Sequence, residues 1–224
     1  TLRKKNGLYG FVKRNESEYD PFGTAHSSTA VSAGLGIKIA KDINKDNANV
    51  VCVVGDGALS AGLAYEGLNN AGALKKRLIV ILNDNKMSID KPVGAMSTYL
   101  TRLLSSKSYS SLRNLIKKFS KALPNNFSKT LYRTEEFSKG MLSGGTLFEE
   151  LGFYYLGPID GHNVNELVSV LENIRDNKFN KPIFLHCITK KGKGYEPAEK
   201  SDDKFHGVEK FDIGTGESLN KSNQ

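Results

Sequence analysis

The chain has 224 residues, of which 38% are hydrophobic and 25% are charged, as is ordinary for a folded globular protein. No apolar run is long enough to cross a bilayer and no secretory start is present, so we expect no membrane partner and a cytoplasmic location. The net charge of +8 comes mostly from lysines spread along the chain without interleaved aromatic residues, so we expect no nucleic-acid partner. Cys52 and Cys187 both fall in predicted strands, which favours buried small residues over a disulfide or a metal pair.

The first part of the chain carries little regular structure and then one helix. Residues 1–23 are polar and lack periodicity, so they are predicted as a loop or an extended arm. Small residues over 27–41 predict a helix, with Ser27 or Ser28 as its N-terminal cap.

Two short apolar runs follow, at 50–54 and 78–82, and both are rich in β-branched residues. Runs of this kind, bounded by turn residues, are typical of buried parallel strands. Residues 59–74 between them have helical character. The sequence therefore predicts a strand, a helix and a second strand in succession.

Polar side chains follow each of these strands. A Gly-Asp-Gly triplet centred on Asp56 ends the first run, and an Asn-Asp-Asn triplet that finishes with Asn85 ends the second. Ligands of open α/β sheets bind at the carboxyl ends of the strands, and neighbouring parallel strands lie about 4.8 Å apart. A carboxylate and an amide oxygen at that edge can share one hard cation such as Mg²⁺.

The rest of the chain alternates between helices and strands after one irregular region. Residues 86–145 are rich in Ser and Lys with scattered leucines, so we expect a mobile helical excursion outside the sheet. Apolar periodicity then predicts a helix over 147–151, a strand over 153–155, a helix over 164–175 and a strand over 182–188. This alternation predicts an α/β fold, a doubly wound and mainly parallel sheet with helices on both faces.

Two further expectations concern the ends of these elements. Asn163 or Asn165 is expected to cap the helix over 164–175. No regular element is predicted after Gly192, where the chain becomes polar.

Four separated blocks of sequence resemble the first domain of 1-deoxy-D-xylulose-5-phosphate synthase, in that family's order. They are YDPFGTAHSSTAVSAGLG, GDGALSAGLAYEGLNNAG with LIVILNDNKMSI, GTLFEELGFYYLGPIDGHN and TKKGKGYEPAEKSDDKFHGV. The resemblance implies a thiamin-diphosphate-binding fold in which residues 1–211 form the diphosphate and Mg²⁺ domain, with a tail at 212–224. Its cofactors would be thiamin diphosphate and Mg²⁺.

The resemblance also implies roles for individual residues. The metal ligands would be Asp56, Asn85 and Met87, the last through its carbonyl. The cofactor contacts would be Ala25, His26, Ser27, Gly57, Ala58, Asn85, Lys191 and Tyr195, and the catalytic residues His26 and His206. Ala25 stands where the family usually has Gly, which matters if the backbone there needs a positive φ. His162 is expected to be structural.

The implied activity is that of a transketolase-like transferase. It condenses pyruvate with D-glyceraldehyde 3-phosphate to 1-deoxy-D-xylulose 5-phosphate with loss of CO₂, a precursor of isoprenoids, thiamin and pyridoxal. The family's lead segment, pyrimidine-binding domain and C-terminal domain have no counterpart here. We therefore expect a fragment that is inactive alone, and a homodimer when full length.

Two alternatives remain open at this point. One is another thiamin-diphosphate enzyme, either a transketolase or part of a 2-oxoacid dehydrogenase, which shares the cofactor but not the substrates. The other is a non-catalytic fragment that has kept the fold.

Overall fold

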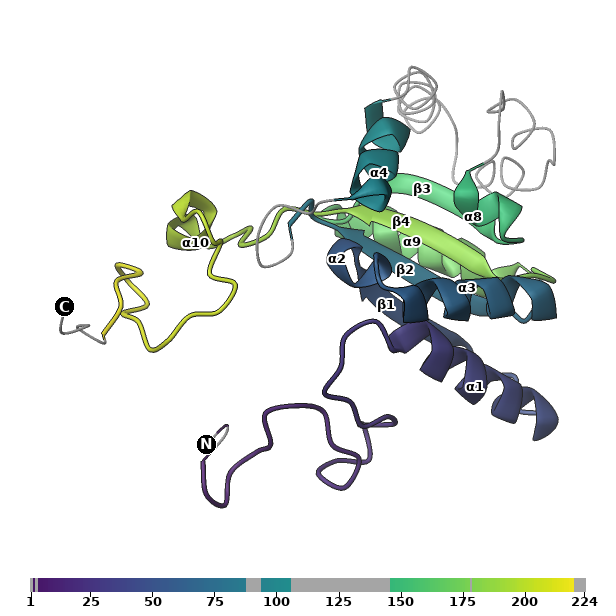
Figure 1. Ribbon diagram of the computed structural model, residues 1–224, viewed down its shortest axis with the longest axis horizontal. Coiled ribbons are helices and arrows are strands. Elements are labelled where there is room, and N and C mark those ends of the chain that lie inside the picture. The colour runs from purple at the N-terminus through teal and green to yellow at the C-terminus, as the bar shows by residue number, and fades with distance from the viewer. Residues whose placement is uncertain (1, 3, 88–93, 106–145, 178, 220–224) are drawn as a thin grey trace.

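The computed structural model describes residues 2, 4–87, 94–105, 146–177 and 179–219. Its centre is a parallel sheet of four strands with helices on both faces (Figure 1). In spatial order the strands are β1 (Val50–Gly55), β2 (Leu78–Asp84), β4 (Ile183–Ile188) and β3 (Tyr154–Asp160). The helices are α1 (Ala30–Ile43), α2 (Asp56–Leu59), α3 (Gly62–Leu74), α4 (Ala95–Ser105), α8 (Leu147–Glu150), α9 (Val164–Asp176) and α10 (Glu196–Lys200).

All three strand pairs of this sheet are parallel, as the sequence predicts. β1 pairs with β2 over its whole length, β2 pairs with β4, and β3 pairs with β4 with one register irregularity between Leu156 and Ile159. β4 is the last of these strands in the chain but lies inside the sheet, between β2 and β3. The predicted α/β class is confirmed.

The larger core lies on the face covered by α1, α3, α4 and α8. It joins the even-numbered apolar residues of β1, β2 and β4 to side chains such as Val31 of α1 and Leu68 of α3. Aromatic rings fill its far end, where Phe148 of α8 stacks on Phe184 of β4 with 3.7 Å between ring centroids. Phe153 meets the Phe184 ring edge-on. This face of the central strands is therefore buried by the helices that cover it.

The smaller core lies on the opposite face, under α9. Val170 and Ile174 of this helix pack with Ile183 and Leu185 of β4. The helix does not reach β1, whose side chains on this face include Val53, 63% exposed. β1 thus has one buried and one open face, and its residues alternate between them.

The helix after the N-terminal arm begins later than the sequence indicates. Ser28 has a φ of 71°, in the left-handed region, so a helix cannot run through it. The helix begins at Ala30, and its N-cap position is Thr29, which makes no capping hydrogen bond through its side chain. The expected cap by Ser27 or Ser28 is therefore wrong.

The other boundaries differ from prediction by a few residues. The helix expected over 59–74 is two helices, α2 and α3, separated at Ser60 and Ala61. Asn163 caps α9 by accepting a hydrogen bond from the Glu166 N–H, as predicted. Two differences concern elements: β3 is longer than the run 153–155, and α10 forms after Gly192. α4 is a helix within the excursion, as predicted. Much of that excursion, 88–93 and 106–145, lies outside the described residues.

Candidate active site

The carboxyl ends of β1 and β2 bring together the polar residues that the sequence singles out. Gly55 is the register partner of Asn83, so the next residues of each chain segment leave the sheet side by side. Asp56 opens α2 directly after β1, and Asn85 follows the last residue of β2. The sheet thus places the predicted carboxylate and amide at one edge.

The Asp56 carboxyl lies in a buried and negatively charged environment. Only 7% of the residue is exposed, and burial is the main cause that raises its pKa above 3.8. The charge of Asp84 raises this pKa further, while the backbone N–H groups of Gly57 and Met87 lower it by donating hydrogen bonds to the carboxylate. A cation at this position would relieve the repulsion between the two acids.

The turn after β2 is fixed by its own side chains. The Met87 N–H donates to Asn85 Oδ1 at 2.9 Å, and the Lys86 N–H donates to Asp84 Oδ1 at 3.2 Å. Lys86 has a φ of 56°, a left-handed conformation that tightens the turn. The Met87 N–H thus donates to Asn85, and the same backbone group also lowers the pKa of the Asp56 carboxyl.

A hydrogen-bonded chain that the sequence analysis missed lies next to this turn, and two of its three residues are buried. His186 Nε2 is 2.9 Å from Asp84 Oδ2, and His186 Nδ1 is 2.8 Å from the Tyr155 hydroxyl. His186 is fully buried and Asp84 is 1% exposed. One signal was present in the sequence, since a histidine interrupts the otherwise apolar strand Ile183–Ile188.

His26 lies on the N-terminal arm and its contacts are local. Its ring Nδ1 is 2.6 Å from the Ser27 carbonyl, and its backbone N–H donates to Thr24 Oγ1 at 3.2 Å. Ala25, His26 and Ser27 are all exposed. The positive φ in this segment belongs to Ser28 and not to Ala25, so Ala in place of Gly causes no backbone strain at position 25.

Lys191, Tyr195 and His206 gather on the segment that follows β4. The Lys191 ammonium contacts His206 Nδ1, and the Tyr195 hydroxyl donates to the Ile213 carbonyl at 2.8 Å. The Tyr195 ring packs against Phe205, with 5.7 Å between centroids. Figure 1 shows that this segment and the N-terminal arm both leave the sheet at the end where α2 lies.

The predicted site residues therefore form three groups in the described part of the chain. Asn85 and Met87 are joined by a hydrogen bond at the edge of the sheet where Asp56 opens α2, with Gly57 and Ala58 beside it in that helix. No hydrogen bond or ion pair joins this group to His26 or to His206 in the described residues. His162 has the structural role expected of it, because its Nε2 accepts the Lys190 N–H at 2.8 Å.

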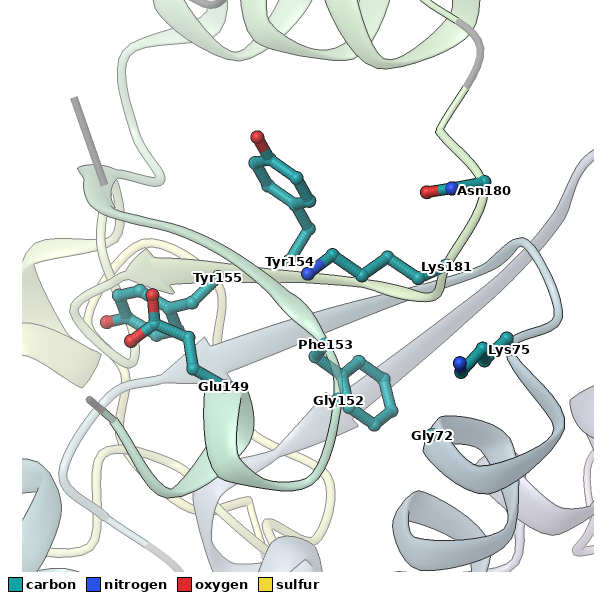
Figure 2. Close-up of a pocket in the computed structure, with 9 residues that line it drawn as sticks. All are labelled: Gly72, Lys75, Glu149, Gly152, Phe153, Tyr154, Tyr155, Asn180 and Lys181. Carbon is teal, nitrogen blue, oxygen red and sulfur yellow. The ribbon is translucent and has the colours of Figure 1, made fainter. Parts of the chain in front are cut away.

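The structure also has an open cavity of about 520 Å³ at the opposite end of the sheet. It lies where β3 and β4 begin, and Figure 2 shows Tyr154, Lys181, Glu149 and Lys75 around it. Asp56 and Asn85 do not line this cavity. It is thus distinct from the edge at which the sequence predicts ligand binding.

The oxygen atoms around Asp56 suit a hard cation. In the described ranges, which omit 88–93 and 106–145, no three His, Cys, Asp or Glu side chains group to hold a metal. The predicted site does not need such a group, because it combines the Asp56 carboxylate with the Asn85 amide oxygen and the Met87 carbonyl. An all-oxygen set of this kind, completed by ligand phosphates, is what Mg²⁺ prefers.

Comparison with known proteins decides the family. Residues 1–189 match the model of the family described as 1-deoxy-D-xylulose-5-phosphate synthase. The chain belongs to this family. Among solved structures it is similar to the transketolase from Campylobacter jejuni subsp. jejuni NCTC 11168, with 22% identity and a TM-score of 0.49. That similarity covers 82% of this chain and 23% of the transketolase, so the chain spans less than a quarter of it.

Membership of the 1-deoxy-D-xylulose-5-phosphate synthase family confirms the resemblance over residues 1–189, which hold the first three sequence blocks. Over the described residues, no helix has both the length and the apolar character needed to span a membrane.

Proposed function

We propose that this chain holds the diphosphate group of thiamin diphosphate, through Mg²⁺, at the carboxyl ends of β1 and β2. The complete enzyme would condense pyruvate with D-glyceraldehyde 3-phosphate and release CO₂, and its product would serve isoprenoid, thiamin and pyridoxal synthesis. Family membership supports the reaction class.

One observation carries the proposal. Asp56 and Asn85 directly follow β1 and β2, whose ends are register partners at Gly55 and Asn83, so the two residues leave one edge of the sheet side by side. A nearby cation would stabilise the ionised form of Asp56, whose pKa is raised by burial and by a second acid. The geometry therefore favours an ion between the two strand ends.

The bound cofactor would supply the electron sink for decarboxylation, and the protein would supply position and charge. Asp56, the Asn85 amide oxygen and the Met87 carbonyl would hold the ion. Gly57 and Ala58 lack bulky side chains, so the backbone there would let phosphate oxygens approach.

The remaining predicted residues would act from the two segments that leave the same end of the sheet. Tyr195 and Lys191 would contact the cofactor, the latter by its positive charge. His26 and His206 would stabilise charge on substrate oxygens or move protons. Ala25 and Ser27 would line the cofactor site beside His26.

These roles would be completed by other parts of the enzyme. We propose that the diphosphate domain, residues 1–211, works with a pyrimidine-binding domain and a C-terminal domain, within a homodimer. The substrates, pyruvate and D-glyceraldehyde 3-phosphate, would meet between these parts.

The test is calorimetric titration of thiamin diphosphate into this chain with Mg²⁺, repeated with a chelator and with Asp56→Asn. Binding that needs both the ion and Asp56 is the expected result. Asp160→Asn is a matched control, because Asp160 ends β3 at the same edge of the sheet and its carboxylate accepts the local His162 N–H. Binding that survives Asp56→Asn, or that is lost equally with Asp160→Asn, would contradict the proposal.

A further inference from the structure

Two buried polar side chains and one half-buried tyrosine form a continuous chain across the face of the sheet that carries the larger core. Tyr155 comes from β3, His186 from β4 and Asp84 from β2. The two contacts measure 2.8 Å and 2.9 Å, and the chain ends at the turn that carries Asn85. Burial of such groups costs free energy unless each is paired, so this pairing is a specific feature of the fold.

The hydrogen-bond roles follow from the chemistry of the partners. The Asp84 carboxylate can only accept, so His186 Nε2 must carry a proton and donate it. A ring with its proton on Nε2 alone has an acceptor at Nδ1, where the Tyr155 hydroxyl can donate. The chain therefore donates in one direction, from Tyr155 through His186 to Asp84.

Both oxygens of Asp84 are engaged as a result. Oδ2 accepts from His186, and Oδ1 accepts from the backbone N–H of Lys86 in the left-handed turn. Asp84 is therefore held as the acceptor that shapes the turn. The neighbouring residues Asn85 and Met87 are presented by that turn.

We propose that Tyr155 and His186 are positioning residues, which hold the turn of residues 84–87 in the conformation that binds the metal ion. This inference rests on the proposed function, because it assigns Asn85 and Met87 to the ion. Neither Tyr155 nor His186 touches the ion; each acts through Asp84. Groups that orient metal ligands in this way typically change metal affinity 10- to 100-fold when they are removed.

The neighbours of His186 make a purely space-filling role a poor explanation. The ring lies in a layer of apolar and aromatic side chains, with Phe184 two residues before it on the same face of β4 and Tyr155 beside it. An apolar residue would fill this space without the cost of burying a polar ring. The structure instead has a histidine whose two nitrogens both find partners.

The proposal is tested by substitutions that keep or remove the donor to Asp84. His186→Gln keeps an amide N–H that can reach Asp84, whereas His186→Leu keeps volume without a donor. Tyr155→Phe removes only the hydroxyl, and Tyr154→Phe is its matched control, since Tyr154 packs on the opposite face against Phe179. The measurement is the Mg²⁺ dependence of thiamin diphosphate binding, by calorimetry.

We expect His186→Leu to weaken the apparent Mg²⁺ affinity at least tenfold and His186→Gln to keep it within about threefold. Tyr155→Phe is expected to weaken it severalfold, and Tyr154→Phe to leave it unchanged. Equal affinity for the Leu variant and the parent chain would overturn the proposal. So would equal loss in the Leu and Gln variants, since both would then report only a damaged fold.

A second measurement needs no cofactor and separates this inference from the proposed function. Hydrogen exchange of the Lys86 and Met87 amides should speed up in His186→Leu but not in His186→Gln, while exchange in β1 stays slow. The ¹⁵N spectrum of the parent His186 ring should show the proton on Nε2. Unchanged exchange, or a proton on Nδ1 alone, overturns the positioning role even if the chain binds cofactor. A parent chain with no Mg²⁺-dependent binding would contradict the proposed function, whereas the exchange result still decides the role of His186 in the turn.

Discussion

Gly72 is the position at which the packing of α3 is most sensitive to a single methyl group. A Cβ atom built on Gly72 would lie 1.7 Å from the Leu151 carbonyl oxygen and 2.9 Å from its carbonyl carbon. These are backbone atoms of the turn between α8 and β3, so they cannot rotate away as a side chain would. Gly72→Ala must therefore push α3 away from that turn.

The size of the effect follows from two opposing contributions. Alanine stabilises a helix interior by about 0.8–1.0 kcal/mol relative to glycine. Overpacking a well-packed core costs about 1–3 kcal/mol, and contact with backbone atoms places Gly72→Ala at the upper end. The net loss is about 2 kcal/mol, which corresponds to a fall in Tm of roughly 4–8 °C for a chain of this size.

The assay is thermal unfolding followed by circular dichroism, with Gly36→Ala as the matched control. Gly36 lies within α1 and is exposed, and a Cβ atom added to it would meet nothing within 4 Å. Gly36→Ala should therefore gain the helix contribution alone and raise the Tm by about 2–4 °C. If Gly72→Ala also raised the Tm, the reasoning from the Leu151 contact would be refuted.

Three further predictions concern thiols, a buried acid and a helix cap. Burial raises the pKa of the Cys52 and Cys187 thiols to about 11, so both should resist thiol reagents at pH 8 until the chain unfolds. Because the folded pKa exceeds the ordinary 9.0, the protonated thiols stabilise the fold below pH 9. This stabilisation is lost as pH rises towards 11 and is on the order of 2 kcal/mol per thiol. The urea midpoints of the parent and a double Cys→Ala variant should therefore converge between pH 9 and pH 11. Without Mg²⁺, Asp56→Asn should unfold at a higher urea concentration than the parent at pH 7, since it removes a buried charge beside another acid. Asn163→Ala should cost about 1 kcal/mol through loss of the cap, whereas Asn165→Ala should cost little, and equal losses in urea titrations would contradict this assignment.

The fold was predictable because its strongest signals are local. The runs 50–54 and 78–82 are short, β-branched and followed by turn residues, and each became a parallel strand. The boundaries that failed depended on information absent from local patterns. The left-handed φ of Ser28 delays α1, and β3 extends to Asp160 because it pairs with β4, which lies far along the chain.

The placement of Asp56 and Asn85 at one edge of the sheet was predictable from the sequence, whereas the side chains that hold the turn after β2 were not. Asp56 and Asn85 end adjacent strands, so spacing alone indicates that they meet. The partnership of Asp84 with His186 depends on strand order, which places β4 and not β3 beside β2. No local pattern gives that order. The histidine at position 186 is unusual in an apolar strand, but its partner could not be predicted from the sequence.

The position of β4 has a consequence for the way this protein is made. As the chain leaves the ribosome, β1 and β2 emerge first and can pair at once, but the open edge of β2 must wait for a strand that ends at Ile188. β3 emerges before β4 and has no described neighbour in the sheet until β4 enters beside it. Pairing between such distant segments is slow, so newly synthesised chains should expose the unpaired edge of β2 until β4 has been made. Pairing with residues 183–188 therefore covers the edge of β2 that could otherwise pair with another nascent chain.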